Sequence, residues 1–177
     1  MATAVDIHKA AWARMTHGSP CGERPFLFDF RLVNGQSFVH ARSRSEPSPF
    51  TQGRGYRLIV RLAPVRRARV DGKVVERFVG RGRGFSSWVT DLLTRHGLRL
   101  ERTHQIVWED LDLGKPVARN HHPHVLHTAL LSFDAVVVDA SLAGKAWERG
   151  IGRHRAWGCG TLILKHAYET DGLAVAS

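Results

Sequence analysis

The chain has 177 residues, of which 43% are hydrophobic, enough for one domain or two small ones with a substantial core. Lysine and arginine number 26 against 16 aspartate and glutamate residues, which gives a net charge of +10. Because arginine supplies most of this excess and its planar guanidinium suits phosphates and guanine edges, we expect nucleic acid as the first partner and an anionic membrane surface as the second.

A membrane partner is the weaker of these two hypotheses, because the arginines lie mainly in predicted loops and a predicted hairpin rather than on one face of an amphipathic helix. Cys21 and Cys159 are the only cysteines and stand far apart, which argues against a disulfide framework and a zinc ribbon. The N-terminus lacks a secretory pattern, and no apolar run approaches membrane-spanning length. We therefore expect a soluble cytoplasmic protein without a membrane segment.

The first third of the chain predicts a helix and a hairpin. Residues Val5 to Met15 carry apolar side chains at helical spacing. Residues Phe26 to Val33 and Gln36 to Arg42 alternate in polarity around Asn34-Gly35, a strong hairpin signal. The segment from Ser43 to Gly55 is rich in Ser, Pro and Gly and predicts a linker.

The remainder predicts strands and helices in a regular order. A strand over Tyr56 to Leu62 is followed by a basic hairpin around Asp71-Gly72, in which Arg66, Arg67, Arg69 and Lys73 gather. A helix over Phe85 to Arg95, closed by Gly97, leads to a strand over Leu98 to Trp108. The last three predicted elements are a strand over His127 to Val138, a helix over Ser141 to Arg149 and a strand over Cys159 to His166.

This order is strand–helix–strand–strand–helix–strand, with the basic hairpin inserted after the first strand. It is the split βαβ order of ferredoxin-like domains, whose sheets commonly bind RNA. We therefore predict an α+β protein with a ferredoxin-like (RRM-like) C-terminal domain.

A glycine-rich stretch, Gly150 to Gly160, joins the last predicted helix to the last strand. Glycine lets the backbone approach another backbone or a phosphate, and successive N–H groups can form a concavity that binds anions. Arg153, His154 and Arg155 add donors to the same stretch, so it predicts a loop that grips a polyanion. The dinucleotide fingerprint needs the opposite order, strand then helix, and no Gly-Lys-Ser/Thr is present. The alternative is a tight connection whose arginines are merely solvated.

Four stretches resemble the CRISPR repeat-processing endoribonucleases of the RAMP superfamily, most closely the enzyme of the type I-E Cascade complex. The most specific are Gly150 to Leu164, similar to that family's C-terminal glycine-rich loop and strand, and Ile7 to Trp12 with Arg24 to Phe28, similar to its first helix and second strand. Tyr56 to Arg67 and Phe133 to Val138 resemble two further segments in the same order.

The resemblance implies cleavage of precursor CRISPR RNA within its repeats, beside a stem-loop, without a metal or cofactor. The 2′-hydroxyl attacks the adjacent phosphate and leaves a 2′,3′-cyclic phosphate, and the enzyme stays on the stem-loop among other Cascade subunits. The family histidine maps onto His8, a general acid or base. The RNA-binding residues are expected to be Arg66, Arg67, Arg69 and Lys73 for the stem, and Gly150, Gly152, Arg153, His154, Arg155, Gly158 and Gly160 for phosphates.

Two departures from the family pattern affect what we expect. Val5 stands where the family has a tyrosine, three residues before the histidine, and its side chain cannot donate a proton. Only Met1 to Ala4 precede the first helix, where the family has a strand, so we expect either that this strand is absent or that the natural start lies upstream of Met1. We therefore predict a reduced N-terminal ferredoxin-like half over residues 1–52, a complete C-terminal domain over 53–168 and a flexible tail over 169–177. Two alternatives remain, a stem-loop-binding subunit without catalysis and an unrelated basic RNA-binding protein.

One histidine cluster has spacing that could suit a metal. His121, His122, His124 and His127 lie close together in sequence, but no cysteine is nearby to complete a zinc site. We expect a loop or a pH-sensitive RNA contact here rather than a metal site.

Overall fold

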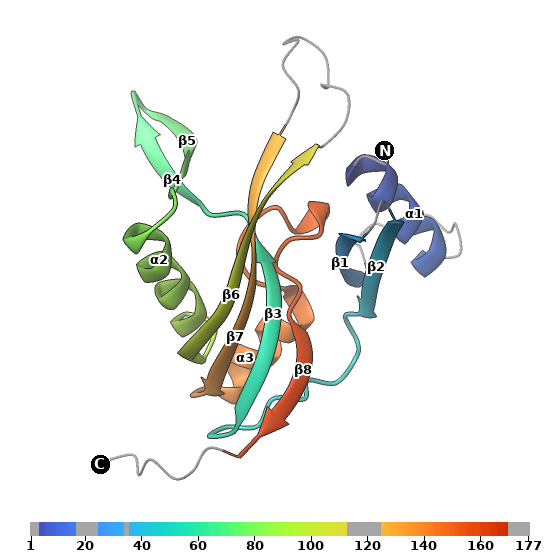
Figure 1. The fold of residues 1–177 in the computed structure, drawn as a ribbon, viewed down its shortest axis with the longest axis vertical. Helices are drawn as coiled ribbons and strands as arrows, with labels where there is room; N and C mark the ends of the chain where they lie inside the picture. The colour runs from blue at the N-terminus through green and yellow to red at the C-terminus, as the bar shows by residue number, and fades with distance from the viewer. Residues whose placement is uncertain (1–3, 17–24, 34–35, 113–124, 170–177) are drawn as a thin grey trace.

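The computed structural model describes residues 4–16, 25–33, 36–112 and 125–169. Its centre is a four-stranded sheet in the order β6-β7-β3-β8, in which every pair of neighbours is antiparallel (Figure 1). These strands span Gly55–Leu62 (β3), Leu98–Asp112 (β6), Val125–Val137 (β7) and Ile163–Tyr168 (β8). This strand order, with one helix in each crossover, is the ferredoxin-like arrangement, so the predicted fold class is confirmed.

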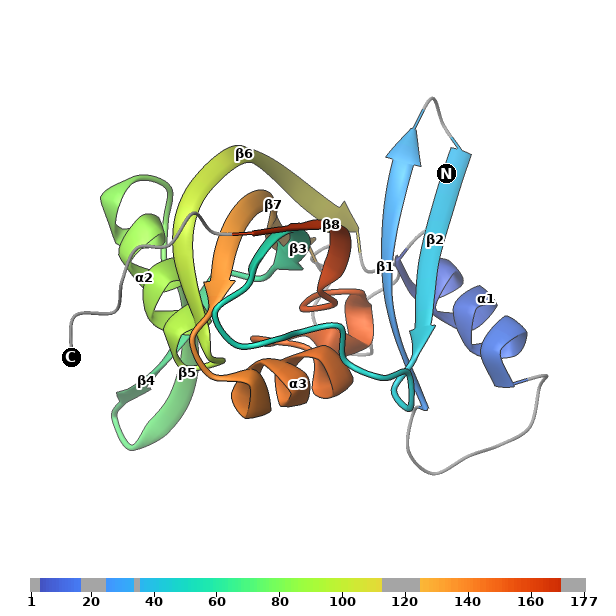
Figure 2. The same ribbon diagram turned by 90° about the horizontal axis from the view of Figure 1, so that it is seen from below.

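Two helices cover one face of this sheet (Figure 2). Helix α2 spans Arg83–Thr94 and α3 spans Ala140–Arg149. The apolar stripe of α2 packs with α3 onto the inward residues of β3 and β7, among them Leu58 and Phe133, which are fully buried. Each such large apolar side chain contributes roughly 1.5–3 kcal/mol when it leaves water, so this cluster is the main core.

A hairpin and a helix form a smaller unit beside one end of the sheet (Figures 1 and 2). Helix α1 spans Ala4–Thr16, and the strands Phe26–Val33 (β1) and Gln36–Ser43 (β2) pair in antiparallel register, as predicted. The predicted Asn34-Gly35 turn and the tail beyond residue 169 lie outside the described residues. The division into domains 1–52 and 53–168 stays a prediction.

The smaller unit and the sheet share a buried ion-pair network. The Arg61 side chain on β3 is 1% exposed; its Nε donates to Asp29 Oδ1 on β1 at 3.0 Å, and a terminal nitrogen donates to the Phe30 carbonyl at 2.6 Å. Glu109 on β6 completes the network with a second ion pair. Burial by itself lowers the pKa of Arg61, but the two carboxylates outweigh it and keep that pKa above its ordinary value. The charged guanidinium therefore links three strands.

The segment between β2 and β3 is packed rather than a free linker. Phe50 is buried, with its ring centroid 5.1 Å from that of Tyr56 and 5.5 Å from that of Trp147 on α3. The Tyr56 hydroxyl donates to the Pro49 carbonyl at 2.8 Å. The segment has the irregular backbone that its composition predicts, and one aromatic side chain fixes it to the core.

A basic hairpin lies outside the sheet and its two helices. Strands β4 (Val65–Val70) and β5 (Lys73–Phe78) form the predicted basic hairpin, which projects from the body (Figure 1). Strands β6 and β8 are the open edges of the sheet, and β6 carries register shifts at Leu100/Arg102 and Thr103/Gln105. No helix among the described residues is long and apolar enough to cross a membrane.

The last strand begins four residues later than predicted, at Ile163 instead of Cys159. Arg155–Trp157 form a short 3₁₀ helix, and the Gly160 N–H donates to the Arg61 carbonyl at 2.7 Å. These backbone bonds hold the chain up to Gly160 in a loop before regular pairing with β3 begins.

Candidate functional site

The glycine-rich loop is folded back on itself. A Cβ on Gly160 would lie 2.0 Å from the Ile151 carbonyl oxygen, and one on Gly158 would lie 3.0 Å from the Phe30 ring. Both glycines and Gly150 are buried, so close packing already accounts for them. Gly152 differs, because it lies on the wall of the cavities described below.

His8 on α1 lies against this loop. Its Nδ1 is 2.7 Å from the carbonyl oxygen of Ala156, 148 positions away in the chain. Because a carbonyl oxygen only accepts, Nδ1 is the donor, and in the neutral ring Nε2 then carries the lone pair. The ring centroids of Phe28 and Trp157 lie 5.8 and 5.9 Å from that of His8 and hold the imidazole in place. This tautomer can accept a proton at Nε2.

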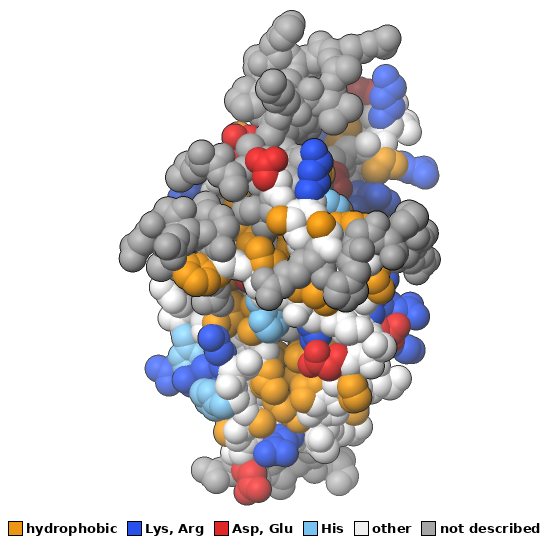
Figure 3. Space-filling view, turned by 90° about the vertical axis from the view of Figure 1, so that its right-hand side faces the viewer, with side chains coloured by type: hydrophobic (Ala, Val, Ile, Leu, Met, Phe, Trp, Pro, Cys, Tyr) orange, Lys and Arg blue, Asp and Glu red, His pale blue; other side chains and the backbone are white. Residues whose placement is uncertain are grey.

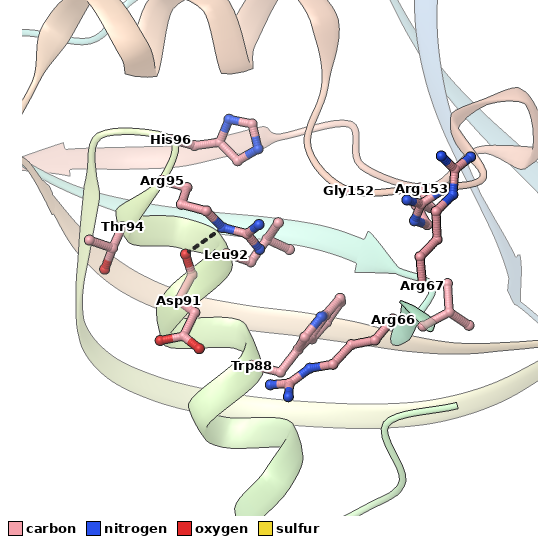
Figure 4. A pocket seen from close by; sticks show the side chains of 11 residues that line it. Arg66, Arg67, Trp88, Asp91, Leu92, Thr94, Arg95, His96, Gly152 and Arg153 are labelled. Atoms are coloured by element: carbon pink, nitrogen blue, oxygen red, sulfur yellow. Dashed lines mark hydrogen bonds between the residues drawn. The ribbon is translucent and has the colours of Figure 1, made fainter. Parts of the chain in front are cut away.

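A cavity of about 950 Å³ lies between the basic hairpin, the end of α2 and the loop (Figure 4). Arg67 and Arg153 lie near one another at one end, with Arg66 beside Trp88. Arg95 and His96 line the other end, together with Asp91. Four arginines against one carboxylate make this an anion-attracting cleft.

His96 is the titratable histidine of this cleft. It is half-buried, and burial, followed by the charges of Arg95 and Arg155, holds its pKa below the ordinary value. It is therefore neutral near pH 7, and an anion in the cleft would favour its protonated form.

A second cavity, of about 670 Å³, shares Gly152 and Arg153 with the first and is lined by basic side chains from separate parts of the chain. Glu76 on β5 projects into it, where its two carboxylate oxygens meet Arg153 at 3.4 Å and His154 Nε2 at 2.9 Å. The full lining is Arg44, Glu76, Gly152, Arg153, His154, Arg155, Ala156 and Trp157. His8 binds Ala156 on the wall of this cavity.

The structure brings most, but not all, of the predicted site residues together. Arg66, Arg67, Gly152, Arg153, His154 and Arg155 line one or both cavities, and His8 adjoins the second. Arg69 and Lys73 are exposed farther along the hairpin and line neither cavity.

Sequence reasoning gave no role to Arg44, Glu76, Arg95 or His96. The only local signal for any of them is that Glu76 stands opposite Arg67 in the hairpin register. The remaining contacts depend on how the hairpin and the loop approach one another in the fold.

The face that carries the N-terminal unit is mixed in character. Figure 3 shows cationic, acidic and hydrophobic side chains interspersed on it. On this face, therefore, the described cations do not form a continuous positive patch.

The histidine cluster is only partly described. His121, His122 and His124 lie outside the described residues, and His127 Nδ1 pairs with Asp110 at 2.8 Å. Within the described residues, no three His, Cys, Asp or Glu side chains are grouped to hold a metal ion. Burial raises the pKa of the Cys159 thiol to about 12, so this cysteine is a core residue and not a nucleophile.

Comparison with known families decides the relationship. A sequence model described as CRISPR associated protein matches residues 31–166, more than half of the chain. The chain belongs to this CRISPR-associated family. The predicted resemblance is therefore confirmed at the level of the family, and a search of curated proteins found no match.

Solved structures show where this CRISPR-associated protein stands by fold. It is similar to Cas6e from Escherichia coli K-12, with a TM-score of 0.69 and 16% identity over 92% of this chain and 91% of that one. It is also similar to a CRISPR endoribonuclease Cse3 bound to a 19-nucleotide RNA, with a TM-score of 0.68 and 19% identity over 92% and 89%. Thermus thermophilus Cse3 bound to a pre-cleavage RNA gives 0.62 and 18% over 93% and 89%.

Proposed function

We propose that this protein is a metal-independent endoribonuclease that cleaves precursor CRISPR RNA within its repeats, beside a stem-loop. It then stays on the guide RNA as a subunit of a Cascade-like complex. The observation that carries the proposal is the hydrogen bond from His8 to Ala156, which sets a proton-accepting imidazole against a loop rich in cations. Similar folds described as RNA-bound Cse3 and as part of an RNA-guided surveillance complex support the choice of partners.

The reaction needs one proton acceptor and stabilisation of negative charge. His8 Nε2 takes the proton of a ribose 2′-hydroxyl, and the freed oxygen attacks the adjacent phosphorus. The bond from phosphorus to the 5′-oxygen breaks, leaving a 2′,3′-cyclic phosphate, and the leaving oxygen takes a proton from water or from protonated His8. Arg153 and Arg155 stabilise the charge that develops on the phosphoryl oxygens.

The hairpin supplies most of the grip on the stem. RNA helices are recognised largely by shape and phosphate contacts, for which Arg66, Arg67, Arg69 and Lys73 are suited. Arg66 and Arg67 line the larger cavity, while Arg69 and Lys73 are free to reach farther along a stem.

A cleavage assay in EDTA tests the proposal. End-labelled RNA of the repeat next to the gene is incubated with the wild type, with His8→Ala and with His166→Ala, an exposed histidine on β8 that serves as the matched control. We expect His8→Ala to slow cleavage by roughly 10²–10⁴-fold, the usual contribution of a general base, with RNA binding almost unchanged. A 2′-deoxy substitution before the scissile phosphate should block the wild type. Cleavage that survives in His8→Ala would remove this residue from the mechanism.

A second candidate function is a stem-loop-binding subunit without catalysis. It is favoured by Val5, one turn before His8 on α1, which offers no proton where the family has a tyrosine. Tight binding of the repeat RNA without cleavage by the wild type would establish this alternative. Membership of the CRISPR-associated family removes the third reading, an unrelated RNA-binding protein.

A further inference from the structure

We propose that the Glu76 carboxylate mimics an RNA phosphate. Its carboxylate occupies an anion site built by Arg153 and His154, and a backbone phosphate of the RNA displaces it on binding. This inference rests on the proposed function for the identity of the ligand, while the anion site itself is independent of it.

Both oxygens of Glu76 face the glycine-rich loop. Oε1 accepts from an Arg153 terminal nitrogen at 3.4 Å, and Oε2 lies 2.9 Å from His154 Nε2. The Glu76, Arg153 and His154 side chains are 38%, 34% and 25% exposed, so solvent and ligands reach all three. The pairs are therefore weak enough to exchange, because exposed ion pairs gain little over hydration.

The cavity holds more positive than negative charge. Its described lining contains Arg44, Arg153 and Arg155, with His154, against Glu76 as the one carboxylate. The Nε of Arg44 is buried and has no hydrogen-bond partner among the described residues. Arginine side chains therefore outnumber carboxylates in the described lining of this cavity, and the site favours a ligand that brings further acceptors.

A phosphodiester matches what Glu76 offers. Like the carboxylate, it carries one negative charge spread over two oxygens, and arginine binds either group through paired N–H donors. The backbone of His154 has a φ of 57°, a left-handed conformation that residues other than glycine rarely adopt. Arg153 and His154 already contact Glu76 with the backbone in this conformation, so both donors are in place before RNA binds.

Displacement of Glu76 would release the hairpin as well. Glu76 lies on β5, directly opposite Arg67 on β4, and is therefore part of the hairpin. Because its two ion pairs are with Arg153 and His154 of the glycine-rich loop, they connect the hairpin to that loop. When a phosphate takes the donors of Arg153 and His154, the hairpin is free to adjust to the stem. Binding at the loop is thereby coupled to binding at the hairpin.

The first test measures RNA binding. Wild type, Glu76→Gln and the matched control Glu101→Gln, whose carboxylate pairs with Arg99 on β6, are titrated by fluorescence anisotropy with a repeat stem-loop carrying the blocking 2′-deoxy substitution. Glu76→Gln keeps the size of the side chain but removes the competing charge. We expect it to bind roughly three- to tenfold more tightly at low salt, with the difference shrinking as salt rises, while Glu101→Gln matches the wild type. Equal or weaker binding by Glu76→Gln would overturn the proposal and make Glu76 a support for the loop.

The second test uses inorganic phosphate, so that it does not depend on RNA. The His154 ring signals are followed by NMR during phosphate titration of the wild type and Glu76→Gln. We expect half-saturation at several-fold lower phosphate in Glu76→Gln, and an identical response in the two proteins would overturn the anion site. A phosphate response together with no preference for repeat RNA over a random stem-loop would reject the proposed function and leave the anion site standing.

Discussion

At the scale of single residues, the site depends on small backbone features. The Ala156 carbonyl fixes the tautomer of His8, and it is presented by a 3₁₀ turn that the glycines on either side make possible. Gly158 and Gly160 adopt φ angles of 80° and 81°; the Phe30 ring leaves little space for a Cβ at Gly158, and the Ile151 carbonyl leaves none at Gly160. The position of the histidine is therefore set by residues with no chemistry of their own.

Gly160→Ala tests this dependence. The added Cβ would meet the Ile151 carbonyl at 2.0 Å, in addition to the cost of a left-handed backbone. The control is Gly72→Ala at the hairpin turn, where φ is 75° and a Cβ meets nothing within 4 Å. Strain of this kind costs about 1–3 kcal/mol, so we expect Gly72→Ala near the lower end and Gly160→Ala beyond it. Urea unfolding measures both, and equal losses would contradict the packing argument.

Sequence reasoning found residues whose chemistry is local and missed those whose partners are distant. The arginines near the Asp-Gly turn and the Gly150–Gly160 stretch could be identified because each is a local pattern. The pairing of Glu76 with His154 spans 78 positions and that of Arg61 with Asp29 spans 32, and neither leaves a periodic signal. Such pairs form only when elements distant in the chain pack together in the fold, and no local sequence pattern marks that packing.

At the scale of elements, hydrophobic periodicity and turn residues were sufficient for the sheet. The sequence predicts a strand over 56–62 and β3 spans Gly55–Leu62, because Leu58, Val60 and Leu62 alternate along the strand and pack into the core. The start of β8 was wrong because the 3₁₀ helix and the Gly160 hydrogen bond depend on contacts with other elements. Tertiary contacts, rather than local preference, decide such boundaries.

His96, in the turn from α2 to β6, leads to a prediction for how the free energy of unfolding depends on pH. The lowered pKa of His96 means that the unfolded chain binds this proton more readily than the folded one. The contribution of neutral His96 to the free energy of unfolding is therefore complete above the pKa of the unfolded chain, near 6.5. It is lost as the pH falls through the lower pKa of the folded protein. We expect His96→Gln to flatten the loss of stability below pH 6.5 by up to about 1.4 kcal/mol per pH unit. Urea unfolding across pH 5–8 measures it, and parallel curves for the two proteins would contradict the assignment.

At the scale of the whole molecule, the Arg61 network makes the N-terminal unit part of the sheet. Arg61→Met keeps the apolar length of the side chain but removes its ion pair with Asp29, which is 1% exposed. Breaking a buried pair costs about 3–5 kcal/mol. We expect a loss of that size in urea unfolding and faster hydrogen exchange of β1 and β2. The double variant Arg61→Met with Asp29→Leu should recover part of it, and a loss below about 1 kcal/mol would show that the network is dispensable.

The two open edges of the sheet have a consequence for how copies of the protein behave together. Strand β6 exposes Arg99, Glu101 and Arg102 and is irregular at two points, while β8 exposes Lys165 and His166. Charged side chains and bulges on an edge prevent a strand of another molecule from adding to it, because the new strand would have to bury those charges and match a broken register. Growth into fibrils by strand addition at these two described edges is therefore disfavoured.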